Sequence, residues 1–193
     1  MGWLVIGISG ATCSGKTSLA RRLHKNLKNS ILIEQDTYFL PVDDPRQTWI
    51  PKLNHINFDL LSSLDMEKMH TDILKFLNEK SRGNSTSLEN EAKVLIVEGF
   101  LIFDYKPISD LCNLKYFLTL KKEECWNRRA LRVYQPPDVP GYFDEIVWPE
   151  YLKYIDKVTN DKDLFNSIKF FDGTQSPDQV YANVYNEIEL KLA

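Results

Sequence analysis

The sequence predicts an α/β protein built around a mostly parallel five-stranded sheet with helices on both faces. Short apolar runs alternate along the chain with longer segments of helical periodicity, which is the pattern of βαβ units. The run from Val94 to Val97 is continuously apolar, as expected of a strand that is buried on both faces. The length of 193 residues suits one domain, so we expect a single domain over residues 1–193.

The first half of the chain supplies three strands and two helices to this prediction. Apolar and β-branched runs indicate strands at residues 3–8, 31–33 and 94–97. Apolar residues at three- and four-residue spacing indicate helices at residues 18–27 and 66–78.

Two other stretches of the first half show no regular period. Residues 37–57 contain three prolines, and a connection of this length is most often a substrate loop or a lid. Asp59 and Asp65 follow as expected helix N-caps, the first of them for a short helical piece. Residues 81–90 are polar and contain Gly83, which indicates an exposed connector.

The second half of the chain adds two strands, three helices and a lid. We expect strands at residues 116–120 and 168–171, and helices at residues 122–132, 149–158 and 176–190. Residues 133–148 are rich in proline, glycine and aromatic residues, and arginines precede them. Together these features predict a short lid at approximately residues 128–148.

The stretch GATCSGKT at residues 10–17 matches the G-x-x-x-x-G-K-[ST] pattern of phosphate-binding loops. It lies between the first predicted strand and the first helix, which is the context that this motif needs. Lys16 would reach the β- and γ-phosphates, and the Thr17 hydroxyl would bind Mg²⁺. The alternative, a glycine-serine turn with an exposed lysine, does not explain that context. We predict nucleotide contacts from Gly10, Ala11, Thr12, Cys13, Ser14, Gly15, Lys16, Thr17 and Ser18.

Acidic residues end three of the other predicted strands. Because ligands gather at the carboxyl ends of parallel strands, we expect Asp36, Glu98 and Asp172 to lie on the same rim as Gly10. Asp36 is the candidate general base or a holder of Mg²⁺-bound water, and Glu98 would orient Mg²⁺ through water. The alternative for each is an ordinary residue of a strand-end turn.

Arg128, Arg129 and Arg132 stand at the end of the helix that we expect at residues 122–132. Arg128 and Arg132 are four residues apart and would share a helical face, whereas Arg129 would point elsewhere. Two arginines on one face could clamp phosphates in a lid. The alternative is a solvated basic helix face.

The composition excludes several classes of partner. The net charge of -3 argues against a nucleic acid or an anionic membrane as partner, and no apolar run is long enough to span a bilayer. Three cysteines without metal-ligand spacing fit a reducing compartment, so we expect a cytoplasmic protein. Cys13 itself is expected to be a small loop residue.

Several motifs, taken in order, resemble the nicotinamide riboside kinases of the uridine kinase-like group of P-loop kinases. The resemblance covers essentially the whole chain, and the lid motifs are its most specific part. These motifs are GISG before the phosphate loop, QD at residues 35–36, DMEKM at 65–69, IVEGFL at 96–101, RVYQPPD at 132–138, PGYFD at 140–144, VWP at 147–149 and DGT at 172–174.

This resemblance implies ATP- and Mg²⁺-dependent phosphorylation of the ribose 5′-hydroxyl of nicotinamide riboside, and of nicotinic acid riboside, for NAD⁺ synthesis. By motif position, Asp36, Lys16 and Glu98 would be catalytic, and Thr17, Asp36 and, through water, Glu98 would bind the metal. ATP would also contact Arg128, Arg132, Asp172, Gly173 and Thr174. The riboside would contact Asp36, Phe39, Phe58, Asp59, Arg129, Tyr134 and Gln135, with Phe58 and Tyr134 on either side of the nicotinamide ring.

The chain departs from the family pattern at three places. Phe58 stands where relatives often carry tyrosine or tryptophan, Thr37 replaces the second member of a double acid, and residues 42–57 differ in sequence and length. Two alternatives remain open at this point: a uridine, cytidine or other small-metabolite kinase, and a non-catalytic nucleotide-binding adaptor. For the kinase we expect a small-molecule acceptor and a monomer.

Overall fold

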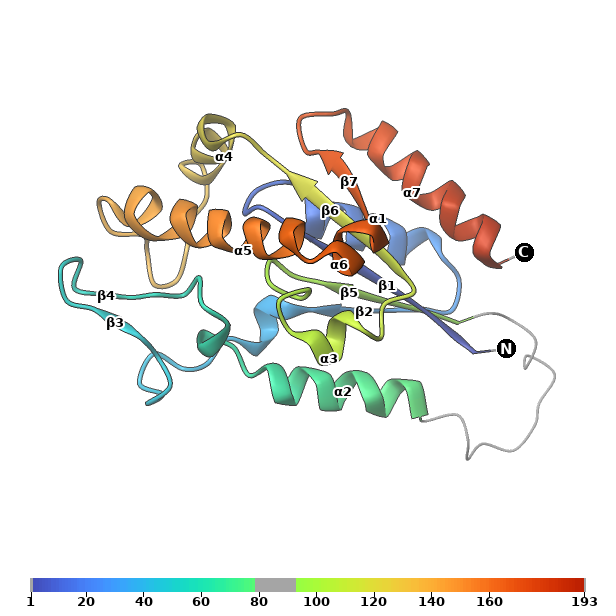
Figure 1. Cartoon of the computed structure of the whole chain (residues 1–193), viewed down its shortest axis with the longest axis horizontal. Coiled ribbons are helices and arrows are strands. Elements are labelled where there is room, and N and C mark those ends of the chain that lie inside the picture. Colours follow the sequence, from blue (N-terminus) through green and yellow to red (C-terminus); the bar gives the residue numbers. More distant parts are fainter. Residues whose placement is uncertain (1, 79–92, 193) are drawn as a thin grey trace.

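A computed structural model describes residues 2–78 and 93–192 of the chain (Figure 1). The connector that was expected at residues 81–90 lies outside the described residues. The five strands form one parallel sheet, so the predicted fold class is confirmed. In spatial order the strands are β2 (Ser30–Glu34), β5 (Lys93–Glu98), β1 (Trp3–Gly10), β6 (Leu114–Thr119) and β7 (Ile168–Asp172).

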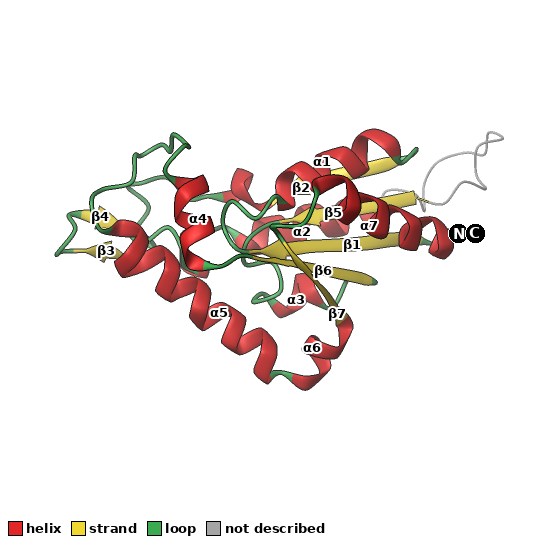
Figure 2. Ribbon diagram, turned by 90° about the horizontal axis from the view of Figure 1, so that it is seen from above, coloured by secondary structure: helices red, strands yellow, loops and turns green. Residues whose placement is uncertain are grey.

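Helices cover both faces of the sheet (Figure 2). Neighbouring residues of a strand point to opposite faces of the sheet. Val5 therefore packs on the face that α2 (Met66–Asn78) and α5 (Trp148–Asn160) cover, and Ile6 packs on the opposite face. That other side is formed by α1 (Lys16–Asn26) and α7 (Pro177–Leu192). The continuous apolar runs in the sequence are thus explained by burial on both faces.

Short elements that the sequence did not predict fill the connections. Residues 37–57 contain a two-stranded antiparallel hairpin, and one-turn and two-turn helices precede β6 and β7. Asp59 caps no helix, whereas Asp65 accepts the backbone N–H of Lys68 in α2 as expected. The short helical piece expected after Asp59 is a 3₁₀ turn at Leu61–Ser63. The elements that were not predicted are a 3₁₀ turn at Gln35–Tyr38, β3 (Trp49–Ile50), β4 (His55–Ile56), α3 (Lys106–Ser109) and α6 (Lys162–Ser167).

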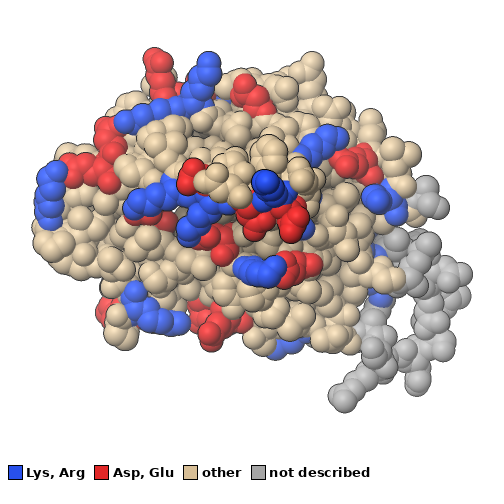
Figure 3. All heavy atoms as spheres, viewed as in Figure 1, with Lys and Arg blue, Asp and Glu red and all other residues tan. Residues whose placement is uncertain are grey.

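The two helices that flank the expected lid differ from their predicted ends. Helix α4 (Lys122–Arg129) ends three residues earlier than expected, and a turn of π-helix (Phe143–Val147) leads directly into α5. Acidic and basic side chains are intermixed on the face seen in Figure 3, as the near-balanced composition suggests. Within the described residues, no helix combines the length and the apolar character that crossing a membrane requires.

Candidate active site

The phosphate loop between β1 and α1 has the geometry that its glycines predict. Gly10 has a φ of 138°, and a side chain there would collide with the carbonyl oxygen of Leu118 in β6. Gly15 has a φ of 96° and is the N-cap of α1. Both glycines are therefore required by the backbone path. As a result, the N-terminus of α1 opens into the loop, where its dipole favours a phosphate anion.

Three side chains of the loop are placed to meet phosphates or a metal ion. Lys16 is buried, and its Nζ donates a hydrogen bond to the carbonyl oxygen of Ala11 at 3.5 Å. The buried Ser14 hydroxyl has no partner among the described residues. The Thr17 hydroxyl donates to Oε1 of Glu98 at 3.0 Å, which joins the loop to the end of β5. The ends of β1 and β5 therefore lie close together, as predicted.

Glu98 and Asp36 bring two carboxylates to the same rim. Burial raises the pKa of Glu98, and Asp36 raises it further, while Lys16 and the Thr17 hydroxyl act in the opposite direction. A divalent cation would offset this accumulation of negative charge. No group of three or more His, Cys, Asp or Glu side chains in the described part of the chain could hold a metal by itself. Thr17, Asp36 and Glu98 offer oxygen donors, which are the ligand type that Mg²⁺ prefers.

Gln35 fixes the turn that carries Asp36, and sequence reasoning assigned it no role. Its side chain is fully buried, and its Oε1 accepts the backbone N–H of Leu101 at 3.0 Å. A Cβ atom at Gly99 would collide with this side chain. Gly99 therefore permits a close approach between the ends of β2 and β5, and that approach positions Asp36 beside Glu98.

A cavity of about 390 Å³ opens beside Lys16 and Thr17. All seven residues that were predicted to contact the acceptor line it, together with Arg132, which was predicted to contact ATP. The predicted residues are Asp36, Phe39, Phe58, Asp59, Arg129, Tyr134 and Gln135, and the lining that was not predicted includes Leu40, Pro41, Val42, Phe100, Pro136 and Asp138.

The walls of this cavity are aromatic on more than one side. The Phe39 ring stacks on Phe100 with centroids 6.0 Å apart, and it meets Phe58 edge-on at 6.0 Å. From the lid, Tyr134 lies under the Arg129 guanidinium, whose Cζ is 4.3 Å from the ring centroid. The cavity thus offers aromatic surfaces from the 37–58 segment and from the lid.

Arg129 is the central cation of the lid, and its side chain contacts other groups than those of Arg128 and Arg132 do. It is buried and forms a two-point ion pair with Asp138, with distances of 2.6 and 2.9 Å. Its Nη1 donates to the Thr12 hydroxyl at 3.1 Å. Burial opposes its charge, but the hydrogen bond to Asp138 and the negative charges of Asp59 and Asp138 more than offset this effect and raise the pKa of Arg129. Arg129 therefore stays positively charged, and its side chain is held between the phosphate loop and the 390 Å³ cavity.

Arg128 and Arg132 do not share a helical face, because α4 ends at Arg129. Both nevertheless reach the phosphate loop. Nη1 of Arg128 donates to the carbonyl oxygens of Cys13 at 3.3 Å and Gly173 at 3.1 Å, and Arg132 approaches the Cys13 sulfur at 3.7 Å. The two arginines therefore approach the phosphate loop from the end of α4 and from the irregular segment after it.

Asp59 lies in the cavity opposite Arg129. Desolvation raises the pKa of Asp59 to about 6, although the Arg129 charge and a hydrogen bond from Tyr142 lower it. Sequence reasoning missed two partners of these side chains: Asp138, which pairs with Arg129, and Tyr142, whose hydroxyl bonds to Asp59. Both belong to quoted lid motifs, but no spacing in the sequence links Asp138 to Arg129 or Tyr142 to Asp59.

A second cavity, of about 510 Å³, lies on the other side of the phosphate loop. Six residues that were predicted to contact ATP line it: Ser14, Gly15, Ser18, Arg128, Gly173 and Thr174. Asp172 does not line the cavity; it accepts hydrogen bonds from the backbone and hydroxyl of Thr174, which lower the pKa of Asp172. Arg22, Pro177 and Tyr181 also line this cavity and were not predicted.

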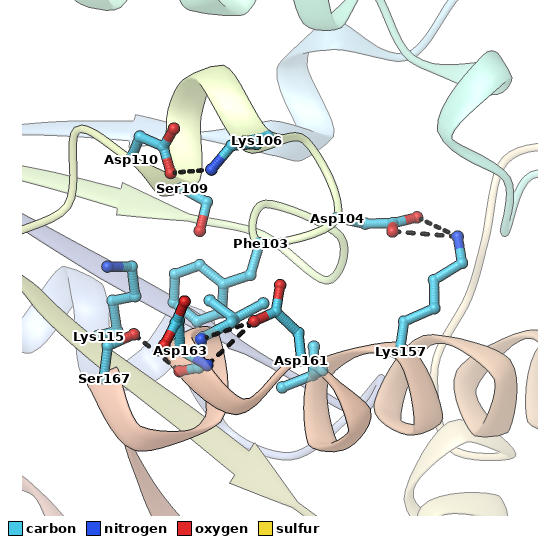
Figure 4. A pocket seen from close by; sticks show the side chains of 12 residues that line it. Phe103, Asp104, Lys106, Ser109, Asp110, Lys115, Lys157, Asp161, Asp163 and Ser167 are labelled. Atoms are coloured by element: carbon cyan, nitrogen blue, oxygen red, sulfur yellow. Dashed lines mark hydrogen bonds and ion pairs between the residues drawn. The ribbon is translucent and has the colours of Figure 1, made fainter.

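A third cavity, of about 440 Å³, lies between α3, α5 and α6 and contains none of the predicted site residues (Figure 4). Its charges are largely neutralised within the lining. Lys157 pairs with Asp104, Lys106 pairs with Asp110, and Asp161 accepts the first N–H groups of α6. The first two cavities, which the predicted acceptor and ATP residues line, therefore remain the candidate site.

A phosphate loop, two strand-end carboxylates and an arginine-bearing lid between two cavities define a P-loop kinase. The AAA domain family matches residues 6–149 of the chain. A solved structure, an unliganded sugar kinase from Janibacter sp. HTCC2649, covers 97% of this chain and 95% of its own with a TM-score of 0.58 and 14% identity. That likeness supports the fold alone.

Curated relatives give the particular family. Nicotinamide riboside kinase 1 of Homo sapiens is 42% identical, over 98% of this chain and 94% of its own. Nicotinamide riboside kinase 2 of Mus musculus is 38% identical, over 98% and 97%. A uridine kinase of Mycoplasma genitalium is 27% identical, over 83% of each chain. The chain belongs to the nicotinamide riboside kinase family.

Proposed function

We propose that the protein transfers the γ-phosphate of ATP to the ribose 5′-hydroxyl of nicotinamide riboside and so forms nicotinamide mononucleotide for NAD⁺ synthesis. The observation that carries this proposal is the 390 Å³ cavity, in which aromatic walls, Asp59 with Arg129, and Asp36 meet next to Lys16. The names of the most similar relatives support the same acceptor.

The donor side uses mainly the backbone of the phosphate loop. Its N–H groups and Lys16 would hold the β- and γ-phosphates, while Arg128 and Arg132 would approach them from the lid. The 510 Å³ cavity beside Gly173 and Thr174 has room for the nucleotide base. Mg²⁺, held through Thr17, Asp36 and Glu98 with phosphate oxygens and water, would neutralise charge on the transferred group.

The acceptor side requires a group that takes the proton of the 5′-hydroxyl. Asp36 lines the same cavity as the acceptor-binding residues and adjoins Lys16 and Thr17. Its carboxylate would accept that proton as the new oxygen–phosphorus bond forms. Asp59 and Arg129, which carry opposite charges, would bind the 2′- and 3′-hydroxyls and thereby aim the 5′-hydroxyl at the phosphate.

The base of nicotinamide riboside is a pyridinium cation, which suits the aromatic walls. Contact of a cation with the faces of Phe58 and Tyr134 would contribute about 0.5–2 kcal/mol, depending on desolvation. Nicotinic acid riboside has the same ring and is a second expected acceptor. The free thiols of Cys13, Cys112 and Cys125 fit a reducing compartment, so we propose that the protein acts in the cytoplasm. We propose separately that it acts as a monomer.

An acceptor panel tests the proposal. ATP consumption is measured with nicotinamide riboside, nicotinic acid riboside, uridine and cytidine, with Asp36→Asn as the inactive control. We expect the highest kcat/KM for nicotinamide riboside. If uridine or cytidine gave the highest value, the protein would be a pyrimidine nucleoside kinase instead, and if no acceptor accelerated ATP consumption, it would be a nucleotide-binding adaptor.

A further inference from the structure

The lid residue Tyr142 contacts Phe58 and Asp59 from outside the lining of the acceptor cavity. Its side chain is almost fully buried in a cluster with Phe143 and Val147, and its ring lies 4.8 Å from that of His55. The preceding Gly141 has a φ of 84°, which turns the chain so that Tyr142 points inward. The ring is therefore held in place independently of any bound acceptor.

The Tyr142 hydroxyl bridges two residues of the acceptor cavity. It accepts the backbone N–H of Phe58 at 2.9 Å and donates to Oδ2 of Asp59 at 2.9 Å. A phenol has one proton, so accepting from Phe58 leaves that proton directed at the carboxylate. Among the described residues, no hydrogen bond engages Oδ1 of Asp59. Tyr142 thus fixes one carboxylate oxygen and leaves the other for a ligand.

Other contacts fix the backbone of this segment. The N–H of Asp59 donates to Oδ1 of Asn57 at 3.0 Å, and the carbonyl oxygen of Asn57 accepts the Ser63 hydroxyl at 2.6 Å. Within the described residues, the Tyr142 hydroxyl makes the only hydrogen bond to the side chain of Asp59. Loss of that hydroxyl would therefore free the carboxylate and remove the acceptor of the Phe58 N–H, while the contacts of Asn57 with Asp59 and Ser63 remain.

We propose that Tyr142 is a positioning residue, through which the lid sets the orientation of Asp59 and of the Phe58 ring for acceptor binding. This inference rests on the proposed function, because it assumes that Asp59 and Phe58 hold the riboside. It adds a residue of the lid that does not itself line the acceptor cavity.

The charge state of Asp59 supplies a readout that a purely structural role would not change. The charged groups that act on Asp59 are Arg129, Asp138 and Glu150, beside the Tyr142 hydroxyl. Arg129 and Tyr142 favour the ionised carboxylate, whereas desolvation and the two acids disfavour it. Removing the hydroxyl should therefore raise the pKa of Asp59 and move the acid limb of acceptor kcat/KM to higher pH.

The test compares Tyr142→Phe with Tyr154→Phe in the full chain. Tyr154 is an equally buried tyrosine whose hydroxyl also bridges a backbone N–H, that of Phe103, and a side chain, that of Ser9, but outside the acceptor cavity. We expect both variants to lose thermal stability. Only Tyr142→Phe should raise the acceptor KM, by about tenfold, without changing the ATP KM, and shift the acid limb upward.

Unchanged acceptor KM and acid limb in folded Tyr142→Phe would overturn the proposal, and so would equal KM changes in both variants. Adding Tyr142→Phe to Asp59→Asn should cause little further loss of acceptor kcat/KM, since the partner of the hydroxyl is already altered.

A second experiment applies if Tyr142→Phe does not fold. Placing 3-fluorotyrosine at position 142 makes the phenol a stronger donor, so the acid limb should move to lower pH; an unmoved limb would contradict the proposal. If wild-type protein prefers uridine, the proposed function fails, but the same comparison is made with uridine.

Discussion

The donor half and the acceptor half of the site are built by different means. The donor half is built mainly on eight consecutive residues, Gly10 to Thr17, whose two glycines set the path of the loop backbone before the start of α1. The acceptor half assembles side chains from the segment after β2, from the loop before α2 and from the lid. We therefore expect the donor half to fail when its backbone is changed and the acceptor half to fail when individual side chains are changed.

The largest effect is expected where the two halves meet, at Asp36. Asp36→Asn keeps the size of the side chain but removes the group that accepts the hydroxyl proton. Turnover should fall by about 10²–10⁴-fold, while ATP affinity stays largely intact. Steady-state kinetics and ATP titration of the same preparation measure both quantities. A turnover rate near that of the wild type would remove Asp36 as the base.

Gly10→Ala should break the donor half through its backbone. The new Cβ would collide with the Leu118 carbonyl group at a positive φ that only glycine adopts readily. We expect at least about 10-fold weaker ATP binding, because strain of about 1–3 kcal/mol would displace the loop. ATP titration checks this, with Gly2→Ala as the matched control, since Gly2 has open space around it. Equal ATP affinity in both variants would contradict the backbone explanation.

The pH dependence should single out the acceptor half. The pKa of Asp59 is raised to about 6, so the carboxylate is ionised above this pH and protonated below it. If the ionised form binds the ribose, acceptor kcat/KM should fall as the pH falls through about 6, to about one tenth at pH 5. Acceptor kcat/KM is measured at saturating ATP from pH 5 to 8. Asp59→Asn should lack this limb, and an identical limb in that variant would assign it to another group.

The smallest effect is expected for a side chain of the donor half. The Cys13 sulfur lies 3.6 Å from the Tyr134 hydroxyl and 3.7 Å from Arg132, which lower the pKa of its thiol although burial opposes them. Cys13→Ser keeps the backbone, so the ATP KM should change by no more than about twofold. Steady-state kinetics with varied ATP measure this KM. A tenfold rise in the ATP KM would show that the thiol contributes directly to phosphate binding.

The two halves also differ in how far the sequence predicts them. The phosphate loop is local, so motif and context together predict its residues, its strand and its helix. The acceptor residues follow from the family resemblance, but their partners do not. Tyr142 and Asp59 are 83 positions apart, and their hydrogen bond depends on the path of the lid. The same holds for Gln35 and Leu101, which meet only because Gly99 lets two strand ends approach.

Short elements were the other failure of prediction. The β3–β4 hairpin, α3 and α6 are too short to show a period in the sequence. The end of α4 at Arg129 was missed because the next three residues are compatible with a helix. As a result, Arg128 and Arg132 do not share a helical face, and the ion pair of Arg129 with Asp138 was not predicted.

The central claim is that the acceptor half determines the substrate, and Tyr134 tests it most directly. The measurement is the ratio of kcat/KM for nicotinamide riboside to that for uridine, in wild-type protein and in Tyr134→Ala, together with the ATP KM. The account predicts a ratio well above one in the wild type, a fall of about 2–30-fold in the variant through loss of the cation–π contact, and an unchanged ATP KM. An unchanged ratio, or an equal loss for ATP and riboside, would contradict it.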